Sequence, residues 1–394
     1  MPAQNRQRLP HRSVILVASA VAFSLLGDQA LYAILPIHFK ALGLFPYQVG
    51  IILSANRWIR LITNHLAERI TARIDTVWVM PLGLLVSALL CFIYGFGYPF
   101  PAILGARLLW GLCWSFLRQI GIMTSVASTV TGHAGKAIGY YTGISCIGPI
   151  TGCFIGALLF DILGFRSTFI IFGILTLFGI PLGYASQKGN QVQKPEATPG
   201  AAGEKSENRG LLIFFGFVVG CAGPGLVMST LGFILKDQFG GHITAGPIVV
   251  GIATVNGFLL ASRNIIGTIG APFFGTYVDW IGYRKGAFIC FAAATMTLAT
   301  AMAAQSLVLL LSMILLFFIS AAIAMVLLSA QAATHGPRVY ASLATALDLG
   351  AALGPIVGWT ILEFISMPTL SFALGAILYG MAMLFSIRQI NQAP

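Results

Sequence analysis

One acidic residue lies in the middle of a long apolar run. Asp28 stands in "LLGDQALYAILP", and the chain on both sides of it is apolar enough for a membrane helix. A carboxylate at the centre of such a helix costs about 2.5–3.5 kcal/mol, so it should face a cavity or a partner rather than lipid. Burial favours its neutral form and a nearby arginine favours its charged form. Asp28 could therefore exchange a proton when its surroundings change.

Most of the other charges within apolar runs are positive. Asp348 is a second embedded acid, which either meets Arg57 or Arg60 and shares in proton coupling, or lies at the inner end of its helix and closes a salt bridge there. Guanidinium groups suit carboxylates and phosphates, so the excess of arginine favours an anionic or zwitterionic ligand. Alternatively, some of these arginines reach the interface by snorkelling, Arg118 before the others. The embedded arginines are Arg57, Arg60, Arg107, Arg118 and Arg263.

The composition places these charges in a bilayer. Of the 394 residues, 57% are hydrophobic and only 8% are charged, whereas soluble domains carry about 25% charged residues. A membrane helix needs about 20 apolar residues, so the chain has room for about twelve and needs no strand. The fold class is therefore all-α and polytopic. The predicted helices cover 13–37, 46–67, 75–97, 101–127, 134–160, 166–186, 209–236, 245–277, 285–304, 307–333, 338–364 and 368–388.

A polar segment divides these helices into two sets of six. The stretch at 187–208 is rich in Gly, Pro, Lys and Glu and cannot bury a core, so we predict a flexible linker. The predicted domains are an N-terminal tail at 1–12, a six-helix bundle at 13–186, the linker, a second bundle at 209–388 and a C-terminal tail at 389–394.

The basic residues orient the chain. With the N-terminus inside, fourteen Lys and Arg residues fall in inner segments, and three (Lys40, Arg166 and Lys236) fall in outer segments. Both termini and the linker are then cytoplasmic, as expected in a bacterial-type inner membrane. The net charge of +11 faces anionic lipid, and we expect no nucleic-acid partner.

Two sequence patterns occur once in each half. "NHLAERITAR" follows the second predicted helix and "GTYVDWIGYRK" ends the eighth, each with an acid one turn before basic residues. "GISCIGPITGCFIG" and "DLGAALGPIVGW" both combine Gly-Pro with glycines at four-residue spacing. A repeat of six helices is the signature of several transporter folds.

With these motifs the chain resembles the major facilitator superfamily over essentially its whole length, and is most similar to the drug:proton antiporter branch. The family's loop signature between helices two and three is matched at Leu66, Ala67, Arg69 and Arg73, and Glu68 keeps its acidic charge. The resemblance implies a gate between the two halves; alternatively, these are solvated charges that only obey the charge rule. The implied gating residues are Glu68, Arg69, Arg73, Asp279, Arg284 and Lys285.

The resemblance extends to the fourth, fifth and eleventh helices. Arg107 and Gly111 match the fourth-helix pattern, and the fifth helix carries the antiporter signature. Glycines allow close helix approach and Gly-Pro loosens the backbone, so hinging and tight packing are both predicted, and they are not exclusive. The residues concerned are Gly143, Gly148, Pro149, Gly152, Gly354 and Pro355.

The resemblance implies a proton-coupled secondary transporter that exports a small organic molecule by alternating access. The alternative is a facilitator or importer of an anionic metabolite or metal chelator. Arg107 is the expected partner of Asp28, because helices one and four line the same cavity in this family; a fixed ion pair is the competing interpretation. The predicted substrate-binding residues are Asp28, Tyr32, Arg57, Arg60, Arg107, Trp110, Arg263 and Asn256.

Other classes of function lack support in the sequence. We find no H-E-x-x-H, P-loop or G-x-S-x-G motif, so an enzyme or a self-contained ATP-driven pump is not expected. The six cysteines lie in apolar runs without a C-x-x-C pair, and we expect neither disulfides nor a metal site. The proton is the expected coupling ion, with no cofactor. The expected partners are substrate and membrane lipid, and the expected state is a monomer.

Overall fold

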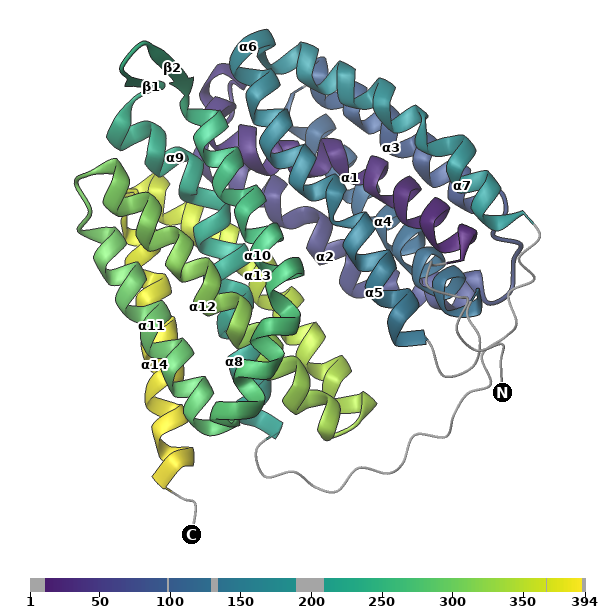
Figure 1. The fold of residues 1–394 in the computed structure, drawn as a ribbon. Coiled ribbons are helices and arrows are strands. Elements are labelled where there is room, and N and C mark those ends of the chain that lie inside the picture. Colours follow the sequence, from purple (N-terminus) through teal and green to yellow (C-terminus); the bar gives the residue numbers. More distant parts are fainter. Residues whose placement is uncertain (1–10, 98, 129–133, 189–208, 366, 392–394) are drawn as a thin grey trace. The chain divides into compact units, whose positions relative to one another are not determined.

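The computed structural model describes residues 11–97, 99–128, 134–188, 209–365 and 367–391. Within these residues, nine helical segments are long and apolar enough to cross a membrane by length and composition. The predicted linker and the two predicted tails lie largely outside the described residues. Figure 1 shows an almost entirely helical chain, as the composition predicts.

The first half forms six membrane-length passes. Gly164 has φ +80° inside α6, and this left-handed residue separates the fifth pass from the sixth, as the predicted break between 160 and 166 requires. The fifth pass consists of α5 and the first part of α6, and the sixth consists of the rest of α6 and α7. The elements are α1 (Arg12–His38), the 3₁₀ turn η1 (Phe39–Leu42), α2 (Pro46–Thr71), α3 (Val79–Gly95), α4 (Phe100–Ala127), α5 (Ala134–Ser145), α6 (Ile147–Leu177) and α7 (Gly179–Gln187).

The second half forms six more passes. Its first pass contains a π-helical stretch, η2, centred on Pro224, which has no N–H to donate to the helix ladder. The elements are α8 (Arg209–Gly220), η2 (Cys221–Val227), α9 (Met228–Phe239), α10 (Ile252–Ile281), α11 (Tyr283–Met302), α12 (Leu307–Thr334), α13 (Pro337–Ile365) and α14 (Leu370–Asn391). Together the two halves confirm the predicted fold of twelve helices.

A short hairpin precedes α10, and here the sequence prediction is wrong. Strands β1 (His242–Ala245) and β2 (Ile248–Gly251) pair antiparallel, where we predicted a helix from residue 245 and no strands. Gly246 takes φ +62° and Pro247 follows it, an arrangement that suits a tight hairpin turn. The β-branched residues on either side of this turn favour strands over a helix. The helix therefore begins only at Ile252.

The residues group into two compact units, which we describe separately. Unit 1 comprises Met1–Leu31 and Ile59–Glu196, and unit 2 comprises Tyr32–Trp58 and Ala197–Pro394. The last turns of α1 and the first half of α2 thus make their contacts mainly with the C-terminal helices. The division by sequence into bundles at 13–186 and 209–388 remains a prediction.

In unit 1, glycines let α6 pack directly on the backbone of α1. A Cβ on Gly148 would lie 2.2 Å from the carbonyl oxygen of Ala22, and one on Gly152 would lie 2.6 Å from that of Leu26. Real Cβ atoms do not approach backbone this closely, so only glycine fits at either position. The antiporter-like signature is therefore a close-packing motif in this structure.

Unit 2 repeats the same device with α13 and the π-containing pass. A Cβ on Gly350 would lie 2.2 Å from the carbonyl oxygen of Phe217, and one on Gly354 would lie 2.4 Å from the Cα of Gly225. The two Gly-Pro motifs therefore serve equivalent helix pairs, as a six-helix repeat predicts. Gly143 differs from the other predicted packing glycines, because a Cβ there would meet nothing within 4 Å.

This packing predicts opposite effects for two glycine-to-alanine substitutions. Gly148→Ala should destabilise the protein by about 1–3 kcal/mol, because the added methyl overpacks a helix–helix contact. Gly143→Ala, the matched control, should leave stability unchanged or raise it by up to about 1 kcal/mol, since alanine is the better helix former. Thermal unfolding in detergent can be followed with a thiol-reactive dye, because all six cysteines are free. Equal melting temperatures for the two variants would contradict the packing.

Candidate functional site

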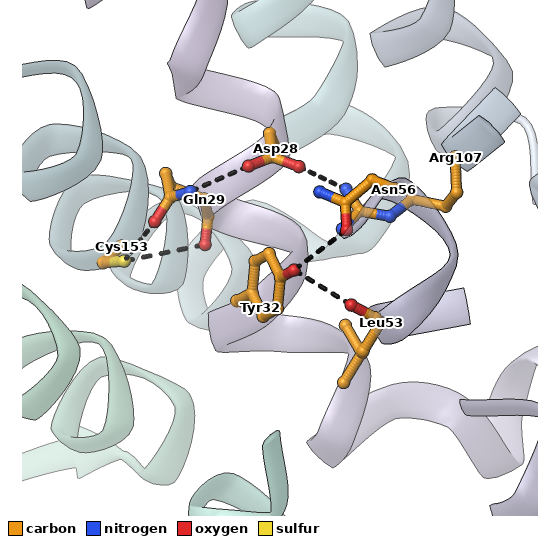
Figure 2. Close-up of polar contacts among 7 residues, drawn as sticks. All are labelled: Asp28, Gln29, Tyr32, Leu53, Asn56, Arg107 and Cys153. Atoms are coloured by element: carbon orange, nitrogen blue, oxygen red, sulfur yellow. Dashed lines mark hydrogen bonds and ion pairs between the residues drawn. The ribbon is translucent and has the colours of Figure 1, made fainter. Parts of the chain in front are cut away.

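A buried ion pair joins α1 to α4. The Arg107 guanidinium donates through Nη1 to Oδ1 of Asp28; the aspartate is 6% exposed and the arginine is fully buried (Figure 2). Both ions lie in apolar segments, so each needs the other to offset the cost of leaving water. The predicted pairing of Asp28 with Arg107 is confirmed. Whether the pair opens during a functional cycle stays a prediction.

Gln29 binds the other oxygen of the same carboxylate. Its Nε2 donates to Oδ2 of Asp28 over 2.7 Å, so each carboxylate oxygen accepts a hydrogen bond. Figure 2 shows Gln29 between Asp28 and Cys153 of α6. Sequence reasoning did not select Gln29, although a polar residue directly after an embedded acid was a signal that could have identified it.

Two side chains of α3 complete the surroundings of the pair in unit 1. The hydroxyl of Tyr94, which is 2% exposed, interacts electrostatically with both Arg107 and Asp28. Cys91 is also buried within electrostatic range of Asp28, and its Sγ fills the space that a Cβ on Gly27 would need. A glycine before Asp28 therefore lets α3 approach the acid. Neither Tyr94 nor Cys91 was selected from the sequence.

Tyr32, one turn after Asp28, binds backbone on α2. Its hydroxyl donates to the carbonyl oxygen of Leu53 over 2.9 Å and lies 3.3 Å from Oδ1 of Asn56 (Figure 2). The side chain is 3% exposed. In this conformation Tyr32 holds α1 against α2 within unit 2. Its predicted role in binding a substrate remains a prediction.

Trp110 follows the arginine of the pair on α4, and the other embedded charged residues are more exposed. Trp110 is 4% exposed and follows Arg107 by three positions, so the two share a face of α4. Its indole packs on Trp114 with ring centroids 6.0 Å apart. Arg118 is exposed on the same helix, as the snorkelling alternative expects. Four of the embedded charged residues predicted from the sequence are half-buried. Arg60 belongs to unit 1, and the other three, Arg57, Arg263 and Asp348, belong to unit 2.

The comparisons with known proteins agree with this architecture. A family model described as the Major Facilitator Superfamily matches residues 17–355. The chain belongs to the Major Facilitator Superfamily. It is a multi-pass membrane transporter for a small molecule and not an enzyme. A search of curated proteins found no match.

Solved structures of two transporters share the fold of this Major Facilitator Superfamily chain at low sequence identity. A bacterial homologue of the human lysosomal transporter Spinster is 14% identical, with 98% of each chain covered and a TM-score of 0.76. The nucleoside transporter NupG is also 14% identical, with 97% of this chain and 99% of NupG covered and a TM-score of 0.73. These likenesses establish the fold.

The six predicted gating residues of this superfamily member are exposed. Glu68, Arg69 and Arg73 lie at or just beyond the end of α2, and Asp279, Arg284 and Lys285 lie around the junction of α10 and α11. Across the described parts of the chain, none of these six side chains takes part in an ion pair. Their gating role remains a prediction, because a gate would bring them together in another conformation.

Within unit 2, two polar side chains hold the C-terminal end of α1. Nδ2 of Asn256 on α10 donates to the carbonyl oxygen of Ala33 over 2.8 Å, and Nζ of Lys236 on α9 donates to that of Ile37 over 2.8 Å. A cation at a helix C-terminus is favourable, because the last carbonyls carry partial negative charge. Asn256 is fully buried, so it has a structural contact in this conformation, and its predicted substrate contact remains untested.

This contact predicts the effect of removing the Asn256 amide. Asn256→Ala should lower stability by about 1–3 kcal/mol, because it removes a buried hydrogen bond to α1. Gln238→Ala, an exposed position on α9, is the control and should have no measurable effect. The measurement is thermal unfolding in detergent. Unchanged stability with loss of transport would instead assign Asn256 to substrate binding.

Proposed function

We propose that this protein is a proton-coupled secondary active transporter that exports a small organic molecule by alternating access. Its setting is a bacterial-type inner membrane, with both termini cytoplasmic. The observation that carries the proposal is the buried Asp28–Arg107 pair, in which an acid and a base that are costly to bury lie within two membrane helices.

The pair can alternate between two sets of partners. When Asp28 is ionised and paired with Arg107, each ion neutralises the other and the pair does not need a substrate charge. A zwitterionic substrate can replace both partners, with its cation on the ionised carboxylate and its carboxylate or phosphate on the guanidinium fork, which matches these groups. A proton on Asp28 neutralises the carboxylate and displaces the substrate's cation, so proton and substrate exclude each other, as proton-driven export requires. A purely anionic substrate would instead bind the released guanidinium together with the proton, which is the import alternative.

A single titrating carboxylate provides enough coupling for useful export. One proton moving inward at a membrane potential of 100 mV releases about 2.3 kcal/mol. That free energy supports a roughly fifty-fold ratio between the concentrations of a neutral substrate on the two sides of the membrane, since each 1.4 kcal/mol is a factor of ten. A pH gradient adds to this value.

Transport in proteoliposomes tests the role of Asp28. Asp28→Asn should lower pH-driven and voltage-driven transport at least tenfold while exchange of substrate continues, because asparagine cannot exchange a proton. Carboxyfluorescein is the anionic probe and ethidium the cationic probe, both under imposed gradients. Asp237→Asn, at an exposed position on α9, is the matched control.

The outcomes separate the competing functions. If native protein and Asp28→Asn respond equally to the gradients, Asp28 is not the coupling residue and the pair is structural. If neither protein responds to a gradient but both carry the anionic probe down its concentration gradient, the protein is a facilitator. Transport of ethidium without carboxyfluorescein would contradict an anionic substrate.

A further inference from the structure

The two oxygens of the Asp28 carboxylate have different kinds of partner. Oδ1 accepts from Arg107, which is a cation, whereas Oδ2 accepts from the neutral amide of Gln29 over 2.7 Å. Arg107 lies on another helix, and Gln29 is the next residue of α1. A motion of α4 relative to α1 therefore changes the first contact and leaves the second in place.

We infer that Gln29 is a positioning residue that holds the Asp28 carboxyl group from the Oδ2 side, so that Oδ1 stays directed at Arg107 and protonation of the group acts on the ion pair. This inference rests on the proposed proton coupling at Asp28. When Asp28 takes up a proton, an O–H bond forms, the carboxyl group loses its charge, and the attraction that holds the Arg107 guanidinium is lost. The guanidinium keeps its own proton and its charge. Protonation and opening of the ion pair thus become one event.

Gln29 suits this task in both protonation states. An ionised carboxylate accepts hydrogen bonds at both oxygens, so Oδ2 takes the amide N–H. When Oδ1 carries the proton, Oδ2 is a carbonyl oxygen and still accepts from the same N–H. The amide has no charge to gain or lose near neutral pH. The hydrogen bond therefore persists when Asp28 takes up a proton, although it is stronger to the ionised carboxylate.

Helix α6 keeps the Gln29 side chain in place. A Cβ on Gly152 would lie 3.0 Å from the Cβ of Gln29, so the absence of a side chain there makes room for it. The Sγ of Cys153 lies 3.6 Å from the backbone oxygen of Gln29 and 4.0 Å from its Oε1, as a weak donor (Figure 2). With Oε1 on the thiol side, Nε2 faces Asp28. The Gly-Pro motif thus links the packing of α6 to the acid.

Other ionisable groups also face Asp28 and must stay constant in a test. These groups are the guanidinium of Arg107 on α4, the phenol of Tyr94 on α3 and the thiol of Cys91 on α3. The thiol of Cys153 faces Gln29. Substitution of Gln29 leaves all four in the protein. Any change in the titration of Asp28 can therefore be assigned to the lost amide.

The first test follows protonation of Asp28 directly and needs no substrate. Infrared difference spectra of the full chain in lipid vesicles record the carbonyl band of the protonated carboxyl group, which is identified by its absence in Asp28→Asn. Gln29→Met keeps the length of the side chain and removes the donor. Since the lost hydrogen bond favoured the ionised form, the titration midpoint should move upward by about one pH unit, a tenfold change in proton affinity.

Two further variants keep this test decisive. Gln119→Met, at a half-buried position about 18 Å along α4 from Arg107, should leave the midpoint where it is. Gln29→Leu, which also lacks the donor, should move the midpoint upward as well, because it removes the same hydrogen bond. It replaces Gln29→Met if that variant does not fold. Unchanged midpoints in the Gln29 variants overturn the inference.

The second test measures whether protonation and pair opening are separated. In Gln29→Met the carboxyl group is no longer held from the Oδ2 side, so it can turn and take up a proton while one of its oxygens still accepts from Arg107. Proton leak into vesicles without substrate, followed with a trapped pH-sensitive dye, should therefore rise several-fold over native protein and over Gln119→Met. Equal leak in all three overturns the inference. If Asp28→Asn abolishes proton-driven transport while Gln29→Met behaves as native, the proposed function stands and only the role of Gln29 fails.

Discussion

The low-dielectric surroundings of the membrane helices set the central constraint on this protein. A lone Asp28 or a lone Arg107 would be costly to bury, and the two together offset each other only if α1 and α4 bring them into direct contact. The pair also takes a second donor from Gln29, and the phenol of Tyr94 lies in electrostatic range. A buried ion pair is weak evidence of stability by itself, because an apolar pair of the same volume is often as stable.

Close helix packing at glycines positions that pair. Helix α6 touches the backbone of α1 in the two turns before the acid, through Gly148 near Ala22 and Gly152 near Leu26. The equivalent contacts of α13 in unit 2 meet a pass that contains the π-helix η2, whereas α1 is continuous around Asp28. The two halves therefore share a packing device and differ in the helix it supports. The acid occurs on the regular helix.

Helix α1 links the acid to contacts further along the chain. Asp28 belongs to unit 1, whereas Tyr32 and the last turn of α1 belong to unit 2, where Asn256 and Lys236 bind its carbonyl oxygens. The helix that carries the acid therefore continues into residues whose contacts belong to unit 2.

The sequence alone determined the class of the protein, the number of helices, the repeat and the location of the embedded charges. These follow from local hydrophobicity, the cost of a charge in a membrane helix and the spacing of glycines, and none depends on how helices are rotated. The pairing of Asp28 with Arg107 was also predicted, through the family resemblance, which places helices one and four at the same cavity and so selects Arg107 among the embedded arginines of the first bundle. The hairpin before α10 was missed, although the Gly246-Pro247 turn was visible in the sequence. Only the tertiary structure decided that Gln29 binds Oδ2 of Asp28 and that Asn256 binds α1, since these contacts depend on the rotation of each helix about its axis.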